Sequence, residues 1–212
     1  MRQRARNRRD LLVGEVHLRL WEILPGRTGV EARVRAILSE YAGRPASKIR
    51  ISRGGGRPRL APGICPDLSF NLSHSHRLAL LAVVHGARVG VDLERVRPGV
   101  RGEAVSRRFF TGREAAALAA VPHGVRDAEF FRTWVRKEAY VKAIGAGVPF
   151  GLARFSVSVG GDAPSIGVTE LEPGPSVFSL YDLDVPAGYV GAVAVEGTDH
   201  RIRWLDADVR AA

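Results

Sequence analysis

The alternation of apolar and polar residues predicts a strand and then a helix near the N-terminal end. EVHLRLWEIL, residues 15–24, alternates with the period of two that is typical of a β-strand. Residues 30–41 carry apolar side chains at the spacing of one helical face, namely Val34, Ile37, Leu38 and Tyr41. The next segment, from Ser52 to Pro66, is so rich in Gly and Pro that we expect a loop.

The most continuous apolar run lies near the middle of the chain. LALLAVV, residues 78–84, and RVGVDLE, residues 88–94, are joined by three residues, His-Gly-Ala. This pattern predicts a hairpin whose first strand is buried on both faces. We expect the hairpin to form the centre of the fold.

The remaining pattern predicts helices followed by short strands. Helical segments are expected over residues 103–110, 111–120 and 127–144, with Gly145 ending the last one. FSVSV, SVFSLYDLD, YVGAVAV and IRWLDA then read as strands, because they are rich in β-forming residues between Gly, Pro and Asp. The order predicts an α+β fold. We expect a basic flexible tail over residues 1–10, an N-terminal half over 11–90 and a C-terminal half over 91–212.

The composition is that of an ordinary globular chain of 212 residues, with 45% hydrophobic and 25% charged residues. No apolar run approaches the roughly 18 residues that cross a bilayer, and the first ten residues lack the apolar core of a secretory signal. Cys65 is the single cysteine, which excludes an internal disulfide and fits a reducing compartment. We therefore expect a cytoplasmic monomer without a membrane partner.

The net charge of +10 predicts a polyanionic partner. Nucleic acid, an anionic membrane, a phosphate-rich ligand and an acidic protein all satisfy it. Most of the positive charge is arginine, and the only lysines are Lys48, Lys137 and Lys142. Two lysines in one segment of such a chain indicate a need for a compact ammonium, although a solvated surface would also accept them.

A pair of carboxylates lies in the sequence GVDLE, residues 90–94. Asp92 and Glu94 are two positions apart, so in a strand they project from one face. Two neighbouring carboxylates repel unless a cation or an arginine lies between them, and hard oxygen ligands suit Mg²⁺. A solvated pair at a strand end near Arg95 and Arg97 is the alternative.

Two further groups of residues suggest chemistry. Trp134, Glu138 and Lys142 follow i, i+4 and i+8 and share one helical stripe, although a core Trp above an ordinary Glu–Lys pair has the same spacing. In FNLSHSH, residues 70–76, the side chains of Ser73 and His74 suggest a loop that cradles a phosphate. A metal site is an alternative for the two histidines, although His-x-His without further ligands is a weak pattern. A serine nucleophile is another alternative, although no Gly-x-Ser-x-Gly elbow surrounds it.

The segments FNLSHS, GVDLE and WVRKEAYVKA resemble the three signature motifs of the 4'-phosphopantetheinyl transferase superfamily, in its large, surfactin-synthetase-activating branch. GGGRPRL is similar to the family's Gly-Lys-Pro loop, and RRFFTGREAAAL to its arginine–phenylalanine–glutamate segment. The order of the motifs also agrees. The similarity runs over residues 49–155, about half of the chain.

The resemblance implies two similar α/β halves, related by a pseudo-twofold axis, with coenzyme A in the cleft between them. It also implies magnesium-dependent transfer of the 4'-phosphopantetheine arm of coenzyme A to a serine of an acyl- or peptidyl-carrier protein, with release of 3',5'-ADP. An acidic carrier would satisfy the basic surface, so no nucleic-acid partner is expected. The alternative is a basic nucleic-acid-binding protein, which explains the charge but not the motifs.

The resemblance assigns roles at matching positions. Asp92, Glu94 and Glu138 match the magnesium ligands. Lys142 matches a lysine that contacts the pyrophosphate and helps the proton leave the serine. Ser73 and His74 match part of the site for the 3'-phosphate of coenzyme A.

The other implied positions depart from the family pattern or have a second explanation. Arg57 replaces the usual lysine of the glycine-rich loop and keeps a phosphate-binding charge. In the shortened N-terminal region, Arg33 is the nucleotide-binding candidate, beside Arg27 and Arg35. Glu114 is implied to be catalytic with Glu138 and Lys142, but Thr-Gly-Arg-Glu at 111–114 also forms a helix capping box.

Overall fold

The computed structural model describes residues 11–23, 29–52, 58–100, 102–146, 151–160, 166–167 and 177–205. Two sheets and four α-helices make up most of this part. The principal elements are β1 (Glu15–Glu22), α1 (Val30–Ala42), β4 (Leu68–Ser75), β5 (Leu78–His85), β6 (Val89–Arg95), α2 (Gly102–Phe109), α3 (Gly112–Ala120), α4 (His123–Ile144), β9 (Phe178–Leu183), β10 (Tyr189–Glu196) and β11 (Arg201–Trp204). The short elements are β2 (Ile51–Ser52), β3 (Arg59–Leu60), β7 (Ser156–Val157), β8 (Ile166–Gly167) and the 3-10 turns Ala46–Lys48 and Leu152–Arg154.

The two larger sheets pack face to face. One has the strand order β11-β1-β5-β4 and the other the order β6-β10-β9. Leu18 and Leu80 of the first sheet share one buried cluster with Val91 and Val193 of the second. The main core therefore lies between the sheets.

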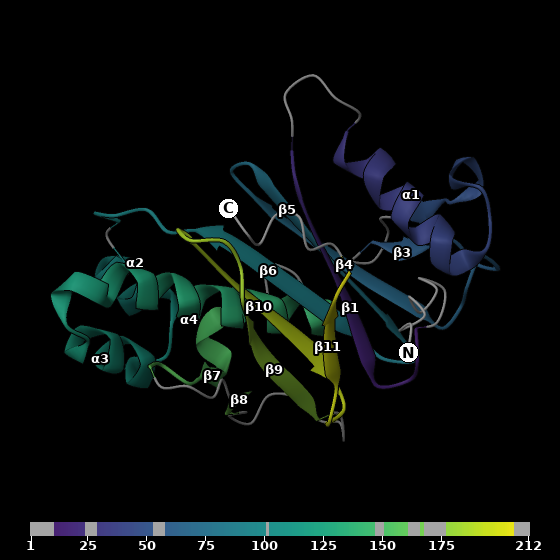
Figure 1. Ribbon diagram of the computed structural model, residues 1–212. Helices are drawn as coiled ribbons and strands as arrows, with labels where there is room; N and C mark the ends of the chain where they lie inside the picture. Colours follow the sequence, from purple (N-terminus) through teal and green to yellow (C-terminus); the bar gives the residue numbers. More distant parts are fainter. Residues whose placement is uncertain are drawn as a thin grey trace, which may run out of the picture.

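A helix covers the outer face of each sheet. Leu38 of α1 packs with Phe70 and Leu81 on the four-stranded sheet. Ala139 of α4 packs in a cluster with Ala192 of the three-stranded sheet. Figure 1 shows α1 and α4 on opposite sides of the strands. The layer order is thus helix, sheet, sheet, helix, which confirms the predicted α+β class.

Most elements match the hydrophobic pattern, but the pairing of the central strands does not. The first strand, the first helix and the fully buried run at 78–84 are confirmed. The predicted hairpin is wrong, because β5 pairs with β1 and β4 whereas β6 pairs with β10. The apolar pattern of a strand specifies how deeply it is buried and not which strand it pairs with.

The C-terminal strand returns to the first one. β11 pairs in parallel with β1, so part of the predicted C-terminal half completes the N-terminal sheet. The predicted boundary at residue 90 falls inside β6. Helix α4 begins at His123, four residues before the predicted start. None of the helices in the described ranges is both long and apolar enough to cross a membrane.

Gly90 sets the distance between β6 and α4. A Cβ atom at this position would lie 2.1 Å from the carbonyl oxygen of Ala139 and 2.3 Å from the backbone nitrogen of Ala143. Both neighbours are backbone atoms of α4, which cannot turn aside as a flexible side chain would. Only glycine allows the helix to lie this close to the strand.

We expect Gly90→Ala to destabilise the protein, because either the strand or the helix must move to admit the methyl group. Overpacking of this kind costs about 1–3 kcal/mol, or more where backbone must shift. A loss of this size lowers the Tm of a chain of this length by several degrees, measurable by differential scanning calorimetry. The matched control is Gly124→Ala in the same helix, where an added Cβ atom would meet no described neighbour within 4 Å. Equal Tm values for the two variants would contradict this account.

Candidate active site

An ion pair between β6 and α4 forms the centre of the site. The ammonium of Lys142 donates hydrogen bonds to Oδ1 of Asp92 at 2.6 Å, to Oγ of Ser73 at 3.2 Å and to the carbonyl of Val91 at 3.3 Å. Asp92 is buried, whereas the Lys142 side chain is 29% exposed. The pair is therefore shielded on the strand side and open to solvent at the lysine.

One oxygen of this buried carboxylate is left over. Oδ2 of Asp92 is buried and has no hydrogen-bond partner within the described parts of the chain. A buried carboxylate oxygen without a partner costs free energy, so such an atom is typical of a place where a ligand or ion binds. Ser73 and Lys142 both bind Oδ1 of Asp92, so Oδ2 is the oxygen that can bind a ligand or ion.

Three carboxylates concentrate negative charge at this contact. Burial raises the pKa of Glu138, the charge of Asp92 raises it further and Lys142 opposes the increase, while Glu94 adds to it. Glu138 lies one helical turn before Lys142, and Glu94 lies two residues after Asp92 on β6. The structure thus brings these four predicted site residues, together with Ser73, to one region.

The oxygen donors suit a hard cation, but they do not form a finished metal centre. Among the described residues, no group of three or more His, Cys, Asp or Glu side chains lies close enough to hold a metal ion. The leftover oxygen of Asp92 and the repulsion felt by Glu138 both fit a bound divalent cation. The assignment of Asp92, Glu94 and Glu138 as magnesium ligands stays a prediction.

The predicted loop is wrong, because residues 68–75 form strand β4, whereas the phosphate site assigned to Ser73 and His74 stays a prediction. Neighbouring side chains of a strand point to opposite faces. Ser73 is buried and its hydroxyl donates to Oδ1 of Asp92 at 2.7 Å. His74 is exposed and points to the other face, on the side of α1. The side chains of Ser73 and His74 therefore lie on opposite faces of β4.

The predicted nucleotide-binding arginines lie away from this ion pair or outside the described residues. Arg33 is exposed on α1, which covers the face of the four-stranded sheet opposite to β6. Arg35 donates to Glu31 on the same helix at 2.5 Å. Arg27 and Arg57 lie outside the described residues.

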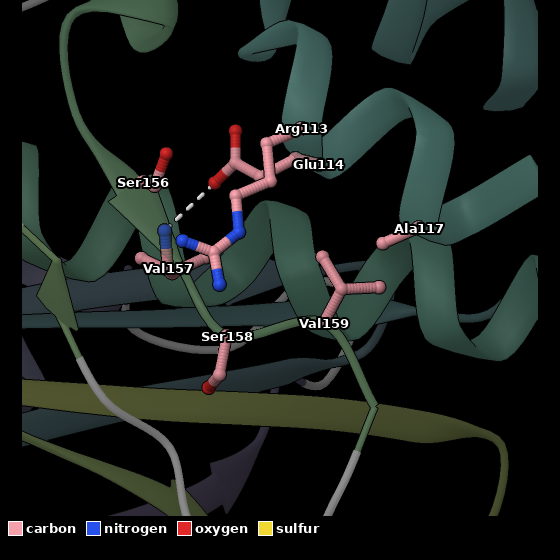
Figure 2. Close-up of a pocket in the computed structure, with 7 residues that line it drawn as sticks. All are labelled: Arg113, Glu114, Ala117, Ser156, Val157, Ser158 and Val159. Carbon is pink, nitrogen blue, oxygen red and sulfur yellow. Dashed lines mark hydrogen bonds between the residues drawn. The ribbon is translucent and has the colours of Figure 1, made fainter.

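Glu114 belongs to a different buried group. It forms the expected capping box, in which its carboxylate accepts from the backbone N–H of Thr111 at 2.9 Å and its own N–H donates to the Thr111 hydroxyl at 3.2 Å. Its Oε1 also accepts from the backbone N–H of Val157 at 2.7 Å, as the dashed line in Figure 2 shows. The side chain is 1% exposed. These contacts connect α3 to β7 and account for the glutamate without a substrate.

Lys137 completes that group, and the sequence did not assign it a role. Its ammonium donates to both carboxylate oxygens of Glu114, at 2.7 and 2.8 Å, and to the carbonyl of Phe155 at 2.6 Å. Burial lowers the pKa of Lys137 and the charge of Glu114 opposes that decrease. Lys137 and Lys142 each donate to three oxygen atoms, which explains a compact ammonium at both positions. The scarcity of lysine was the signal in the sequence.

We expect Glu114→Gln to act on stability, because it leaves the ammonium of Lys137 buried without its counter-charge. Breaking a buried ion pair costs about 3–5 kcal/mol. Thermal and urea unfolding measure this loss. The matched control is Glu103→Gln, which removes an exposed pair with Arg107 worth about 0–1 kcal/mol. A Glu114→Gln protein that unfolds like wild type but has lost kcat would instead place this glutamate in the chemistry.

Comparison with known proteins identifies the family. Residues 88–194 match the 4'-phosphopantetheinyl transferase superfamily. The 4'-phosphopantetheinyl transferase HetI of Nostoc sp. is 36% identical over 166 residues, which are 77% of this chain and 68% of that protein. The 4'-phosphopantetheinyl transferase psf-1 of Bacillus pumilus is 32% identical over 155 residues, which are 73% of this chain and 64% of that protein. The 4'-phosphopantetheinyl transferase Sfp of Bacillus subtilis is 31% identical over 168 residues, which are 78% of this chain and 71% of that protein.

These matches include both elements of the central ion pair, β6 and α4. They confirm the family and the kind of enzyme that the sequence motifs predicted. The chain belongs to the 4'-phosphopantetheinyl transferase superfamily.

Proposed function

We propose that this chain transfers the 4'-phosphopantetheine arm of coenzyme A to a serine of an acyl- or peptidyl-carrier protein. The observation that carries the proposal is the meeting of Asp92 and Lys142 beside Glu138, with one buried carboxylate oxygen left without a partner among the described residues. Relatives that share these segments are named 4'-phosphopantetheinyl transferases. In the proposed reaction, the serine oxygen bonds to the β-phosphate, its proton is lost and 3',5'-ADP leaves.

In this proposal the three carboxylates bind the metal ion and Lys142 acts on the reacting groups. Asp92, Glu94 and Glu138 would hold Mg²⁺, which when bound supplies positive charge to the pyrophosphate. Lys142 would lie beside the pyrophosphate through its solvent-open side and assist proton loss from the carrier serine. Its contacts with Asp92 and Val91 fix the position of the ammonium at the junction of α4 and β6.

The substrates fit the charge of the protein. Coenzyme A carries three phosphate groups, and the chain has a net charge of +10. We assign the 3'-phosphate to the side of the four-stranded sheet that carries His74 and Arg33, with Arg57 as a further candidate. An acidic carrier protein would be attracted to the same basic chain. Action as a cytoplasmic monomer, without nucleic acid, stays a prediction of the sequence.

The decisive experiment is intact-mass analysis of an apo-carrier protein incubated with this chain, coenzyme A and Mg²⁺. We expect the carrier to gain the mass of one phosphopantetheine group. The gain should disappear with EDTA and with a carrier whose acceptor serine is replaced by alanine. An unmodified set of acyl- and peptidyl-carriers, together with salt-sensitive retention of the chain on DNA, would favour the nucleic-acid-binding alternative.

We expect Lys142→Arg to lower kcat by about 100-fold or more, although it keeps the charge. The single nitrogen of Lys142 donates to three oxygen atoms, and a planar guanidinium cannot reproduce these three hydrogen bonds from one nitrogen. The guanidinium also stays protonated. Rates are measured with one carrier protein at saturating coenzyme A and Mg²⁺. The matched control is Lys48→Arg, because Lys48 is exposed and should tolerate the change. If arginine at 142 restores most of the rate lost in Lys142→Ala, the lysine is only a positive charge.

A further inference from the structure

The edges of the two sheets are joined by side chains of β4. The backbone N–H of Val91 donates to Oδ1 of Asn71 at 2.9 Å, that of Leu93 to Oγ of Ser73 at 3.3 Å and that of Arg95 to Oγ of Ser75 at 3.0 Å. The acceptors are alternate residues of one strand and the donors alternate residues of the other. Side chains of β4 thus supply the acceptors that a neighbouring strand would otherwise offer to β6.

Two of these acceptors are hydroxyls, which have one hydrogen of their own to donate. The Ser73 hydroxyl donates to Oδ1 of Asp92 at 2.7 Å, and the Ser75 hydroxyl donates to Oε2 of Glu94 at 2.8 Å. Each serine therefore binds a backbone N–H of β6 and the carboxylate of the residue just before it. A hydrogen bond to an ionised group is short and strong, so it fixes the direction of the carboxylate.

We propose that Ser75 and Ser73 are positioning residues that hold the carboxylates of Glu94 and Asp92 in one orientation for a divalent cation. This inference rests on the proposed function for its catalytic meaning. It gives Ser75 a role, and it places the hydroxyl of Ser73 at the carboxylates rather than at the 3'-phosphate. In this role the serines act through the acidic side chains.

The pattern of contacts separates positioning from simple packing. Asn71 accepts a backbone N–H in the same way as the serines, but its amide oxygen has no hydrogen to give to a carboxylate. The two serines are the members of the row that lie opposite acidic residues. At Asp92, both Ser73 and Lys142 bind Oδ1, so that Oδ2 is the oxygen without a partner among the described residues. The hydroxyl of Ser73 and the ammonium of Lys142 together leave Oδ2 as the available oxygen.

Ser75 offers the cleaner test because it is only partly buried and lies at the end of β4, whereas Ser73 also contacts Lys142. The variants are Ser75→Ala, which removes the hydroxyl, and Ser75→Thr, which keeps it in a strand that accepts β-branched residues. The matched control is Ser69→Ala, on the same face of β4. The other three contacts join residues of β4 and β6 that are twenty positions apart. At the same offset, Ser69 lies opposite Val89, which has no carboxylate.

The first readout is the affinity of the protein for Mn²⁺. Electron paramagnetic resonance measures the concentration of unbound Mn²⁺ in samples that contain neither coenzyme A nor carrier protein. We expect Ser75→Ala to weaken Mn²⁺ binding by about 10–100-fold, the usual effect of losing a group that orients a ligand. Ser75→Thr and Ser69→Ala should bind within about threefold of wild type. Thermal unfolding identifies any variant that has lost its fold. In the transfer assay, Ser75→Ala should lower kcat more than it raises KM for coenzyme A.

The outcomes separate this inference from the proposed function. If folded Ser75→Ala binds Mn²⁺ as well as Ser69→Ala, or if Ser75→Thr is as weak as Ser75→Ala, the positioning role is wrong. If wild type binds Mn²⁺ with the expected order of variants but transfers nothing to any carrier, the proposed function is wrong and the positioning role stands. A wild type that binds no Mn²⁺ overturns both the cation site and the positioning role.

Discussion

The contact of Gly90 with the backbone of α4 is the constraint on which the site depends. Since a Cβ atom would overlap the carbonyl of Ala139, only glycine lets the helix and the strand lie this close. Asp92 is two residues from this contact on the strand, and Lys142 is one helical turn from Ala139 on the helix. An ion pair of 2.6 Å between side chains fifty positions apart follows from that approach. A wider spacing would admit water and weaken the pair.

Buried charges on α4 then hold the helix in one register. Arg136 donates to Asp182 of β9 and to the carbonyl of Ser158 at 2.8 Å, while the adjacent Lys137 binds Glu114 of α3. Lys142, whose side chain is partly exposed, binds the buried carboxylate of Asp92 on β6. Each cation would be left without its counter-charge if the helix slid or turned, and an unpaired buried charge costs several kcal/mol. The charges therefore act together with the apolar contacts of Val135, Tyr140 and Phe131 to fix the position of the helix.

The sequence predicted the faces of these elements better than their neighbours. Strand periodicity correctly put Asp92 and Glu94 on one face, and helix periodicity put Glu138 and Lys142 on one stripe, because both periods are local properties of the backbone. It did not predict that β5 and β6 belong to different sheets, since two apolar strands joined by a tight turn have the pattern of a hairpin. The same limit explains the error at β4. Ser73 and Ser75 read as loop residues because their partners on β6 are twenty positions away.

The groups that orient the carboxylates of Asp92 and Glu94 come from different layers of the fold. The hydroxyls that bind Asp92 and Glu94 come from the edge of the four-stranded sheet, whereas the ammonium that binds Asp92 comes from the helix on the far side of the three-stranded sheet. Neither group alone fixes the carboxylates. Both sheets must meet before the acidic pair has its orientation, and the buried Oδ2 of Asp92 is stabilised only when a ligand then reaches it. Ligand binding at this atom would therefore stabilise the junction of the two sheets as well as the site itself.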